Sequence, residues 1–504
     1  MKNSKYVFLT TLFIWILISI NGQMWEQIGN DIGGEGSWDH SGYSVSLSSD
    51  GSAIAIGADH NSDNGFHSGH VRIYKNVGGE WEQMGGDIDG EGEDDESGHS
   101  VSLNADGSVV AIGSPYNNGS GDFSGQVRIF QYITGDWEQM GSNIELNGWG
   151  DASGWSVSLS SDSLIVAIGA PNNNGNEISP GHVNIYKYNL GYWAKIGSSL
   201  AGEGLGDRFG SSVSLSSDGS VVAVGAFAND GNGDKAGHVR VFQNIEGTWE
   251  QIGDDLDGAA SGDHFGHSVS LSSDGSKVAI SSHQNNGNGL IFGHVGVYYN
   301  FNDNWMQIWD DIETEEADDG FGGSICLSSD GSVLAIGAAL NNENNPSSGK
   351  VRVYKDNSGT WEQIGEIING EEESDYFGQS VSLNLDGSML AVGAPYNDAS
   401  GTNSGHVKVF SLNYTNIDKP TFNDISFYPN PASNMLIIKG HGLGDKGEKM
   451  IIVFDFYGRK IKEVSIPKNK ESINIDIRGL ESGLYFIRMM VDGENVGSGK
   501  VVVE

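Results

Sequence analysis

The sequence predicts an all-β protein, a seven-bladed β-propeller closed by its N-terminal strand and followed by a small C-terminal β-sandwich. One sequence unit recurs seven times at a constant interval of 56 residues, which is typical of a repeat array or a propeller. Each copy reads as four short strands. A spare strand precedes the first copy, and one strand is missing from the last. A glycine anchors each copy: Gly42, Gly98, Gly154, Gly210, Gly266, Gly322 and Gly378.

The first 22 residues have the pattern of a secretory signal peptide. Lys2 and Lys5 precede an apolar run from Tyr6 to Ile20, and Asn21-Gly22 follows as a polar exit. We assign residues 1–22 to this signal. We expect no transmembrane segment, because no other stretch approaches the roughly 18 apolar residues that a span requires.

The fourth copy illustrates how one repeat becomes one blade. Residues 211–215 alternate between polar and apolar, as a strand does, and Asp218-Gly219 then predicts a tight hairpin. Residues 221–226 are continuously apolar, which is expected of a strand covered on both faces. A polar loop leads to a third alternating strand at 237–242.

The fourth strand of each unit is marked by a tryptophan, but its first copy lies before the first anchor glycine. The strand at Trp25–Gly29 can therefore complete the last blade and close the ring, which removes exposed sheet edges. We expect the indoles to wedge between neighbouring blades. The tryptophans are Trp25, Trp81, Trp137, Trp193, Trp249, Trp305 and Trp361.

Charge and cysteine content limit the classes of partner. The net charge of -40 and the pI of about 4.4 disfavour nucleic acids and anionic membranes, since phosphate binding needs Lys and Arg. The single cysteine, Cys326, occupies a position that is Ser in the other six copies, and we expect a small buried thiol.

The long loops between second and third strands share one face with the blade-to-blade connections, and we call it the loop face. The connections are acidic, and Arg208 is the only Lys or Arg in them. Recurring carboxylates and amides could coordinate calcium, or they could shape the loops by binding backbone groups. Both interpretations stay open for the recurring positions, which are Asp39, Asp95, Asp151, Asp207, Asp263, Asp319 and Asp375, with Asn61, Asn117, Asn173, Asn229, Asn285, Asn341 and Asn397.

Five of the seven third strands begin with Gly-His. Zinc would need several of these side chains around one ion, which copies on separate blades cannot provide unless they lie at the axis. We therefore expect a hydrogen bond that repeats from blade to blade. The five are His70, His182, His238, His294 and His406.

The chain contains no nucleophile elbow, zinc-protease helix or phosphate loop. We therefore expect a non-enzymatic binding or adhesion propeller that recognises an extracellular protein or glycan through its loop face. The alternative is a hydrolase or lyase that acts on polysaccharide near the propeller axis, and a cluster of unlike, blade-specific polar residues there would favour it. A passive surface-layer component is a third hypothesis.

The repeat resembles the FG-GAP family, the unit of the integrin alpha-subunit propeller. The resemblance covers about residues 25 to 410 and implies extracellular recognition or adhesion. Integrin blades carry calcium in a long hairpin, which here is only Ser217 to Ser220, so that site does not carry over. The matching residues are Phe209-Gly210, Phe265-Gly266, Phe321-Gly322 and Phe377-Gly378, with Gly169-Ala170-Pro171 and Gly393-Ala394-Pro395.

The tail resembles the C-terminal sorting domain of type IX secretion substrates in Bacteroidota. It implies a β-sandwich that the outer-membrane translocon recognises, and a protein that is released or attached to the cell surface. We divide the mature chain into a propeller at 23–410, a linker at 411–424 and the sorting domain at 425–504. The residues that carry the resemblance are Phe427 to Ala432, Val453 to Arg459, Leu480 to Arg488 and Lys500 to Val503.

Overall fold

The computed structural model contains two compact units, Met1–Thr415 and Asn416–Glu504. It describes residues 23–145, 148–172, 179–283, 293–314, 319–357 and 359–414 of the first unit. In the second it describes residues 426–428, 435–439, 449–454, 460–466, 472–480, 483–491 and 494–503. The expected signal peptide at 1–22 and the expected linker from residue 415 onward lie outside these ranges.

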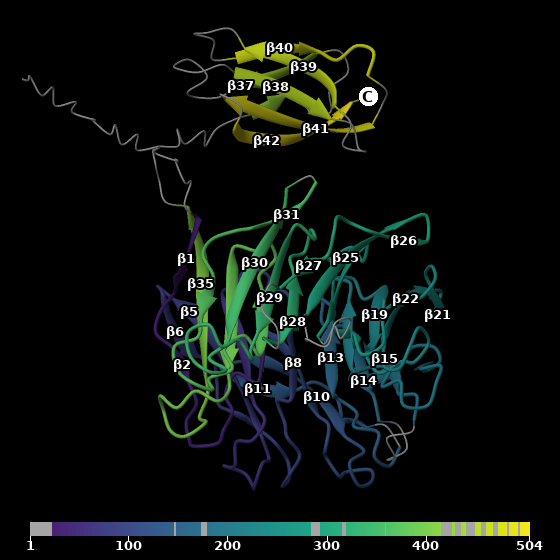
Figure 1. The fold of residues 1–504 in the computed structure, drawn as a ribbon, viewed down its shortest axis with the longest axis vertical. Helices are drawn as coiled ribbons and strands as arrows, with labels where there is room; N and C mark the ends of the chain where they lie inside the picture. Colours follow the sequence, from purple (N-terminus) through teal and green to yellow (C-terminus); the bar gives the residue numbers. More distant parts are fainter. Residues whose placement is uncertain are drawn as a thin grey trace, which may run out of the picture. The chain divides into compact units, whose positions relative to one another are not determined.

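The first unit consists of seven antiparallel sheets, one for each repeat, as the sequence predicts (Figure 1). The innermost strands contact one another in a closed ring, which confirms the seven-bladed propeller. These strands are β3 (Ser44–Leu47), β8 (Ser100–Leu103), β13 (Ser156–Leu159), β18 (Ser212–Leu215), β23 (Phe265–Leu271), β28 (Phe321–Leu327) and β33 (Ser380–Leu383). The second strands are β4 (Ala53–Ala58), β9 (Val109–Ser114), β14 (Ile165–Ala170), β19 (Val221–Ala226), β24 (Lys277–Ser282), β29 (Val333–Ala338) and β34 (Met389–Ala394).

The third and fourth strands form the outer half of each blade. The third strands are β5 (His70–Val77), β10 (Gln126–Ile133), β15 (His182–Asn189), β20 (His238–Ile245), β25 (His294–Phe301), β30 (Lys350–Asp356) and β35 (His406–Tyr414). The fourth strands are β1 (Gln23–Gln27), β6 (Glu80–Gln83), β11 (Asp136–Gln139), β16 (Tyr192–Lys195), β21 (Thr248–Gln251), β26 (Asn304–Gln307) and β31 (Trp361–Gln363).

The N-terminal strand closes the ring, as predicted. β1 pairs antiparallel with β35 of the last blade, and Trp25 lies opposite Leu412. β35 extends to Tyr414, so its last four residues occupy the start of the range that was expected to be linker.

Each blade also has a fifth strand of two residues that the sequence does not predict. It begins the blade-to-blade connection and pairs with the loop-face end of the third strand, so the start of each connection is fixed to its own blade. These strands are β2 (Ile32–Gly33), β7 (Ile88–Asp89), β12 (Ile144–Glu145), β17 (Leu200–Ala201), β22 (Leu256–Asp257), β27 (Ile312–Glu313) and β32 (Ile368–Asn369).

Neighbouring blades are joined by apolar contacts and by repeated hydrogen bonds. The core clusters combine residues of two blades, as when Val183 and Phe209 pack with Val222. The indole nitrogen of Trp81 donates to the carbonyl of Ile28 in the preceding blade at 3.0 Å. Five other repeat tryptophans make the equivalent bond, which confirms that these residues lie between blades.

The anchor glycine marks a point where two blades approach closely. Gly42 has a φ of +92°, and a Cβ atom there would lie 2.7 Å from the carbonyl oxygen of His406. A side chain at this position would be strained and would also clash with backbone. The constant spacing of the glycines therefore reflects the geometry of blade packing.

The second unit contains two antiparallel sheets. Buried apolar residues from both sheets, including Leu436, Ile451 and Ile487, form its core, as in a β-sandwich. One sheet consists of β36 (Ser426–Tyr428), β37 (Met435–Lys439) and β40 (Ser472–Asp476). The other consists of β38 (Lys449–Phe454), β39 (Lys460–Ile466), β41 (Gly483–Val491) and β42 (Glu494–Val503).

Candidate functional site

The recurring aspartates of the loop face are all buried, and most of their described contacts are with backbone of their own connection. Asp39 Oδ2 accepts the N–H of Gly36 at 2.6 Å, and Asp95 Oδ2 accepts that of Gly92 at 2.8 Å. Asp207, Asp263 and Asp375 accept the equivalent N–H at 2.7–3.1 Å. The burial applies to Asp39, Asp95, Asp151, Asp207, Asp263, Asp319 and Asp375.

The recurring asparagines connect these aspartates to the neighbouring loops. Asn229 Nδ2 donates to Asp207 Oδ2 at 2.9 Å, while its Oδ1 accepts the N–H of Gly231 at 2.7 Å. Oδ1 makes the same turn contact at Asn61, Asn117, Asn341 and Asn397. Asn173 and Asn285 lie outside the described residues. These bonds are those of loop-shaping residues, and calcium coordination stays a prediction.

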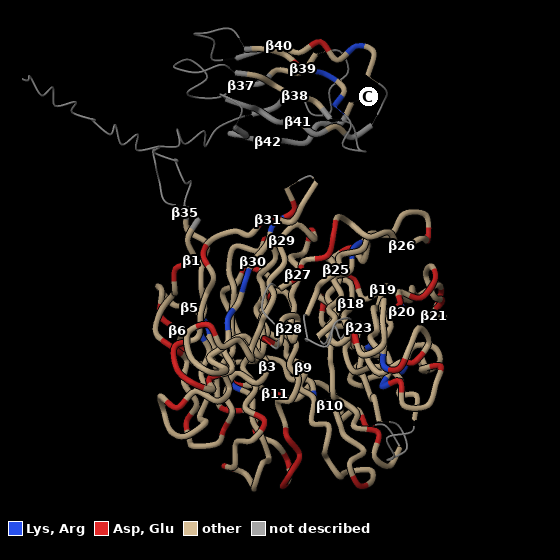
Figure 2. Tube along the Cα trace, in the orientation of Figure 1, with Lys and Arg blue, Asp and Glu red and all other residues tan. Residues whose placement is uncertain are grey.

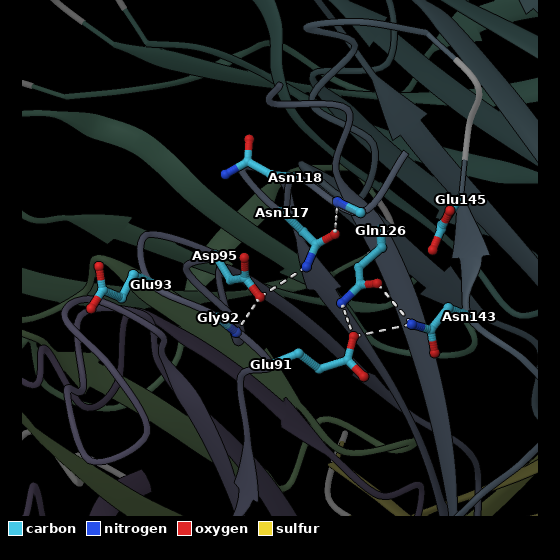
Figure 3. Close-up of a pocket in the computed structure, with 10 residues that line it drawn as sticks. Glu91, Gly92, Glu93, Asp95, Asn117, Asn118, Gln126, Asn143 and Glu145 are labelled. Carbon is cyan, nitrogen blue, oxygen red and sulfur yellow. Dashed lines mark hydrogen bonds between the residues drawn. The ribbon is translucent and has the colours of Figure 1, made fainter. Parts of the chain in front are cut away.

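The acidic character of the propeller is carried largely by its loops, where the trace in Figure 2 marks many Asp and Glu residues and few Lys or Arg residues. In blade 2, acidic residues together with Asn and Gln line a pocket of about 420 Å³ (Figure 3). Glu91 Oε2 accepts hydrogen bonds from Gln126 and Asn143 at 2.8 and 3.0 Å, and the Asp95–Asn117 pair forms part of the wall.

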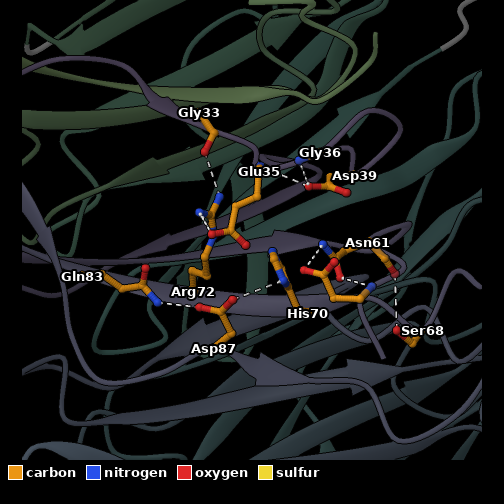
Figure 4. Close-up of polar contacts among 11 residues, drawn as sticks. Gly33, Glu35, Gly36, Asp39, Asn61, Ser68, His70, Arg72, Gln83 and Asp87 are labelled. Carbon is orange, nitrogen blue, oxygen red and sulfur yellow. Dashed lines mark hydrogen bonds and ion pairs between the residues drawn. The ribbon is translucent and has the colours of Figure 1, made fainter. Parts of the chain in front are cut away.

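The same position in blade 1 is a network of charges (Figure 4). The buried His70 lies 3.9 Å from Asp87, measured from Nδ1 to Oδ2, and Arg72 lies 3.4 Å from Glu35. His238 and His406 have equivalent acidic neighbours at 3.8 and 3.7 Å. These contacts recur as the sequence predicts, but they are longer than the hydrogen bonds that were expected.

The blades differ from one another at the inner ends of the loop-face segments, which we call the inner rim. Two variable positions flank the anchor glycine, and a third follows the second strand. Blade 1 places His40, Tyr43 and Asp59 there, whereas blade 3 has Ala152, Trp155 and Pro171. These positions adjoin the innermost strands, which surround the propeller axis, and side chains of adjacent blades meet there: the ring centroids of Tyr43 and His99 lie 5.0 Å apart.

Five polar residues meet on the inner rim of blades 1 and 2, and we call them the rim cluster: His40, Asp59, His60, Glu96 and His99. His40 Nδ1 lies 3.8 Å from Asp59 Oδ1, and His99 Nδ1 lies 3.9 Å from Asp59 Oδ2. Glu96 lies 3.7 Å from both His60 Nε2 and His99 Nδ1. Asp59 thus touches both halves of the cluster.

Burial makes the rim cluster electrostatically unusual. It raises the pKa of Asp59 to about 7 and lowers the pKa of His40 to about 4. Burial also favours the protonated form of Glu96, but the contacts with His60 and His99 hold the pKa of this carboxyl at about 2. Two carboxyl groups in one cluster therefore have opposite protonation preferences.

Two runs of aromatic rings lead from the loop tips to the rim cluster. In the first, Phe66 stacks on His67 at 3.7 Å between ring centroids, and His67 stacks on His60 at 4.3 Å. The second run contains Phe123, Tyr116, Trp155, His99 and Tyr43, whose successive centroids lie 4.7–6.4 Å apart. Four aromatic residues on the tips are more than half exposed: Trp38, Phe66, Phe123 and Trp149.

The rim cluster does not follow from the residues that recur in every copy, because its members occupy positions that vary between copies. A signal was present. Asp59 follows Gly57-Ala58, where three other blades place a proline at Pro115, Pro171 and Pro395. An acid at a proline position of one copy is the kind of departure from consensus that can mark a site.

The family comparisons match both units. Residues 426–504 match the secretion system C-terminal sorting domain, and residues 201–242 and 361–410 match the FG-GAP repeat. The chain carries FG-GAP repeats and a type IX sorting domain. The sorting domain marks it for export and for localisation at the outer membrane or cell surface. No residue among those described lies in a helix long and apolar enough to span a membrane.

Several solved structures are similar to the chain at low sequence identity. An oligogalacturonate lyase from Vibrio parahaemolyticus has 10% identity and a TM-score of 0.45 over 77% of this chain and 97% of its own. PorZ, a surface component of the type IX secretion system of Porphyromonas gingivalis, has 13% identity and a TM-score of 0.39 over 93% and 60%. The propeller of the Trilobed protease from Pyrococcus furiosus has 10% identity and a TM-score of 0.43 over 78% of this chain and 99% of its own. None of the curated proteins matches this sequence.

Proposed function

We propose that the exported propeller is a recognition module that binds an extracellular protein or glycan through its loop face and catalyses no reaction. The observation that carries this proposal is the set of exposed aromatic side chains on the loop tips of adjacent blades. Trp38, Phe66, Phe123 and Trp149 are 51–60% exposed. Exposed aromatic residues contribute strongly to interfaces, because a rigid ring buries a large area at low entropic cost.

The surroundings of these rings support a polar or cationic ligand. Glu91 and Glu93 line the blade 2 pocket, and Asp95 and Asn117 form part of its wall. The carboxylates around this pocket attract cationic groups over several ångströms and disfavour anionic partners. A basic protein surface or a neutral, hydroxyl-rich glycan would suit this face better than an acidic polysaccharide.

Screening of the purified full chain against arrays of glycans and extracellular proteins tests the proposal. A ligand found in this way should lose at least about tenfold in affinity when Trp149→Ala or Phe66→Ala is introduced, as for interface hot spots. The matched control is Leu190→Ala, since Leu190 is 96% exposed but lies in the turn between β15 and β16, away from the loop face. Failure to bind any ligand, or equal losses in all three variants, would overturn the proposal.

A second function is favoured by the rim cluster itself. Unlike, blade-specific polar residues near the axis are the feature that would distinguish a polysaccharide hydrolase or lyase, and His40, Asp59 and Glu96 fit that description. Release of reducing ends or unsaturated products from a panel of polysaccharides would support it. The activity should then be lost in Asp59→Asn, while Leu190→Ala should retain it.

A further inference from the structure

The rim cluster holds buried polar atoms that have no hydrogen-bond partner among the described residues. They are Asp59 Oδ1 and His99 Nδ1, in residues that are 2% and 9% exposed. Buried polar atoms in folded proteins nearly always have a partner, so two such atoms in one cluster require an explanation. A bound cation would satisfy the oxygen and the nitrogen together.

The spacing of the cluster fits ligands arranged around an ion. One donor atom from each of His40, Asp59 and His60 lies within 4.8 Å of the other two, and the same holds for Asp59, Glu96 and His99. The four separations of 3.7–3.9 Å given above exceed hydrogen-bond length. Donors that share a tetrahedral zinc ion lie about 3.3 Å apart, as follows from bonds of about 2.0–2.1 Å. Each of these four pairs would have to close by about half an ångström to reach that spacing.

We propose that the rim cluster binds one divalent transition-metal ion of the zinc type, with Asp59 as the ligand common to both triads. Imidazole nitrogen with carboxylate oxygen is the donor set that zinc prefers, whereas calcium takes oxygen ligands alone. This site is separate from the recurring Asp and Asn positions considered for calcium. It also does not depend on any extracellular ligand or on catalysis.

Two other groups of His and acid on the propeller are better explained as structural. Glu35, His70 and Asp87 lie close together, as do their counterparts in blade 4, but an arginine already pairs with the glutamate in each case. The arrangement repeats between blades, as a consensus contact does. The rim cluster contains no arginine or lysine, and its Asp59 occurs in one blade only.

The experiment uses the full chain after removal of metal by a chelator. Zinc(II) is titrated by calorimetry at moderate salt with excess calcium, and cobalt(II) is added in parallel because its visible absorption reports nitrogen and oxygen coordination. We expect one ion per chain. The repeat supplies substitutions that the fold tolerates elsewhere: Asp59→Pro copies Pro115, and His99→Ser copies Ser211. Each should weaken zinc binding by at least about 100-fold, because each removes a direct ligand.

Controls come from the same repeat. His70→Gln copies Gln126, and His283→Ala copies Ala339 at the repeat position of Asp59; both should retain zinc affinity within about twofold. Asp59→Asn replaces Asp59→Pro if the proline variant does not fold. The proposal is overturned if only weak, salt-sensitive binding occurs, if Asp59→Asn and His99→Ser leave the affinity unchanged, or if His283→Ala abolishes binding.

Discussion

Asn117 Nδ2 donates a hydrogen bond of 2.8 Å to Asp95 Oδ2 and so joins two loop-face segments that lie 22 residues apart in the chain. Both residues are buried, and Asn117 Oδ1 also accepts the N–H of Gly119. Asn117→Ala would leave a buried carboxylate oxygen with one donor fewer and a backbone N–H without its acceptor. We expect a loss of about 1–3 kcal/mol in the free energy of unfolding.

Thermal melting in calcium and in chelator checks this prediction. Loop shaping predicts the same fall of a few degrees in both buffers, because no ion takes part. Glu93→Gln, an exposed change in the same connection, is the control and should leave the melting temperature unaltered. A loss seen only in calcium would instead assign these positions to a calcium site.

The sequence predicts the ring, its closure and the blade contacts because these follow from patterns that many residues share. The strand at Trp25 is an example, since counting strands was enough to pair it with the last blade. The strand β7 at Ile88–Asp89 could not be predicted, because two residues carry no periodicity. The rim cluster could not be predicted for another reason. Contacts such as that of His99 with Asp59 join different repeats and depend on loop geometry that the consensus positions do not encode.

Trp25 is expected to stabilise the whole ring, since β1 closes it without a covalent link to the last blade. Its indole nitrogen donates to the carbonyl of Ile364 at 3.1 Å, and its ring packs on the core between blades 6 and 7. Trp25→Ala should lower the free energy of unfolding by roughly 3 kcal/mol or more, at least as much as Trp137→Ala within the chain. Met24→Ala, at a side chain that is 48% exposed, is the control in calorimetric melting. Similar melting of the Trp25 and Met24 variants would contradict the role of β1.

Acid should destabilise the propeller through its buried histidines. Burial and the nearby Arg72 lower the pKa of His70 to about 4, and burial also lowers the pKa values of His238 and His406. Because the unfolded chain titrates near pH 6.5, it binds more protons than the folded chain between about pH 6.5 and 4, and stability falls as the pH falls through this window. Each group contributes at most about 1.4 kcal/mol per pH unit.

The repeat offers a reciprocal pair of variants for this effect. His70→Gln copies blade 2 and should reduce the loss of melting temperature between pH 7 and pH 5, while Gln126→His should increase it. Melting curves at both pH values for the two variants and the parent give the comparison. An identical pH dependence in all three proteins would contradict the prediction. It would show that the pKa of the histidine at this position is the same in the folded and the unfolded chain.

Cys326 should behave as a structural substitute for serine. Its Sγ accepts the N–H of Leu383 at 3.2 Å, where blade 5 uses Ser270 Oγ to accept the N–H of Leu327 at 2.9 Å. Cys326 is half-buried, less enclosed than the sequence predicts, but desolvation still raises the pKa of its thiol, so little reactive thiolate forms at neutral pH. A thiol reagent should therefore label the folded chain far more slowly than the unfolded chain.

Cys326→Ser should melt within a degree or two of the parent. Cys326→Ala leaves the N–H of Leu383 without an acceptor and should lower the free energy of unfolding by about 1–3 kcal/mol. Rapid labelling of the folded chain would show that the thiol is accessible and reactive. Equal melting of the two variants would show that this hydrogen bond contributes nothing to the contact between blades 6 and 7.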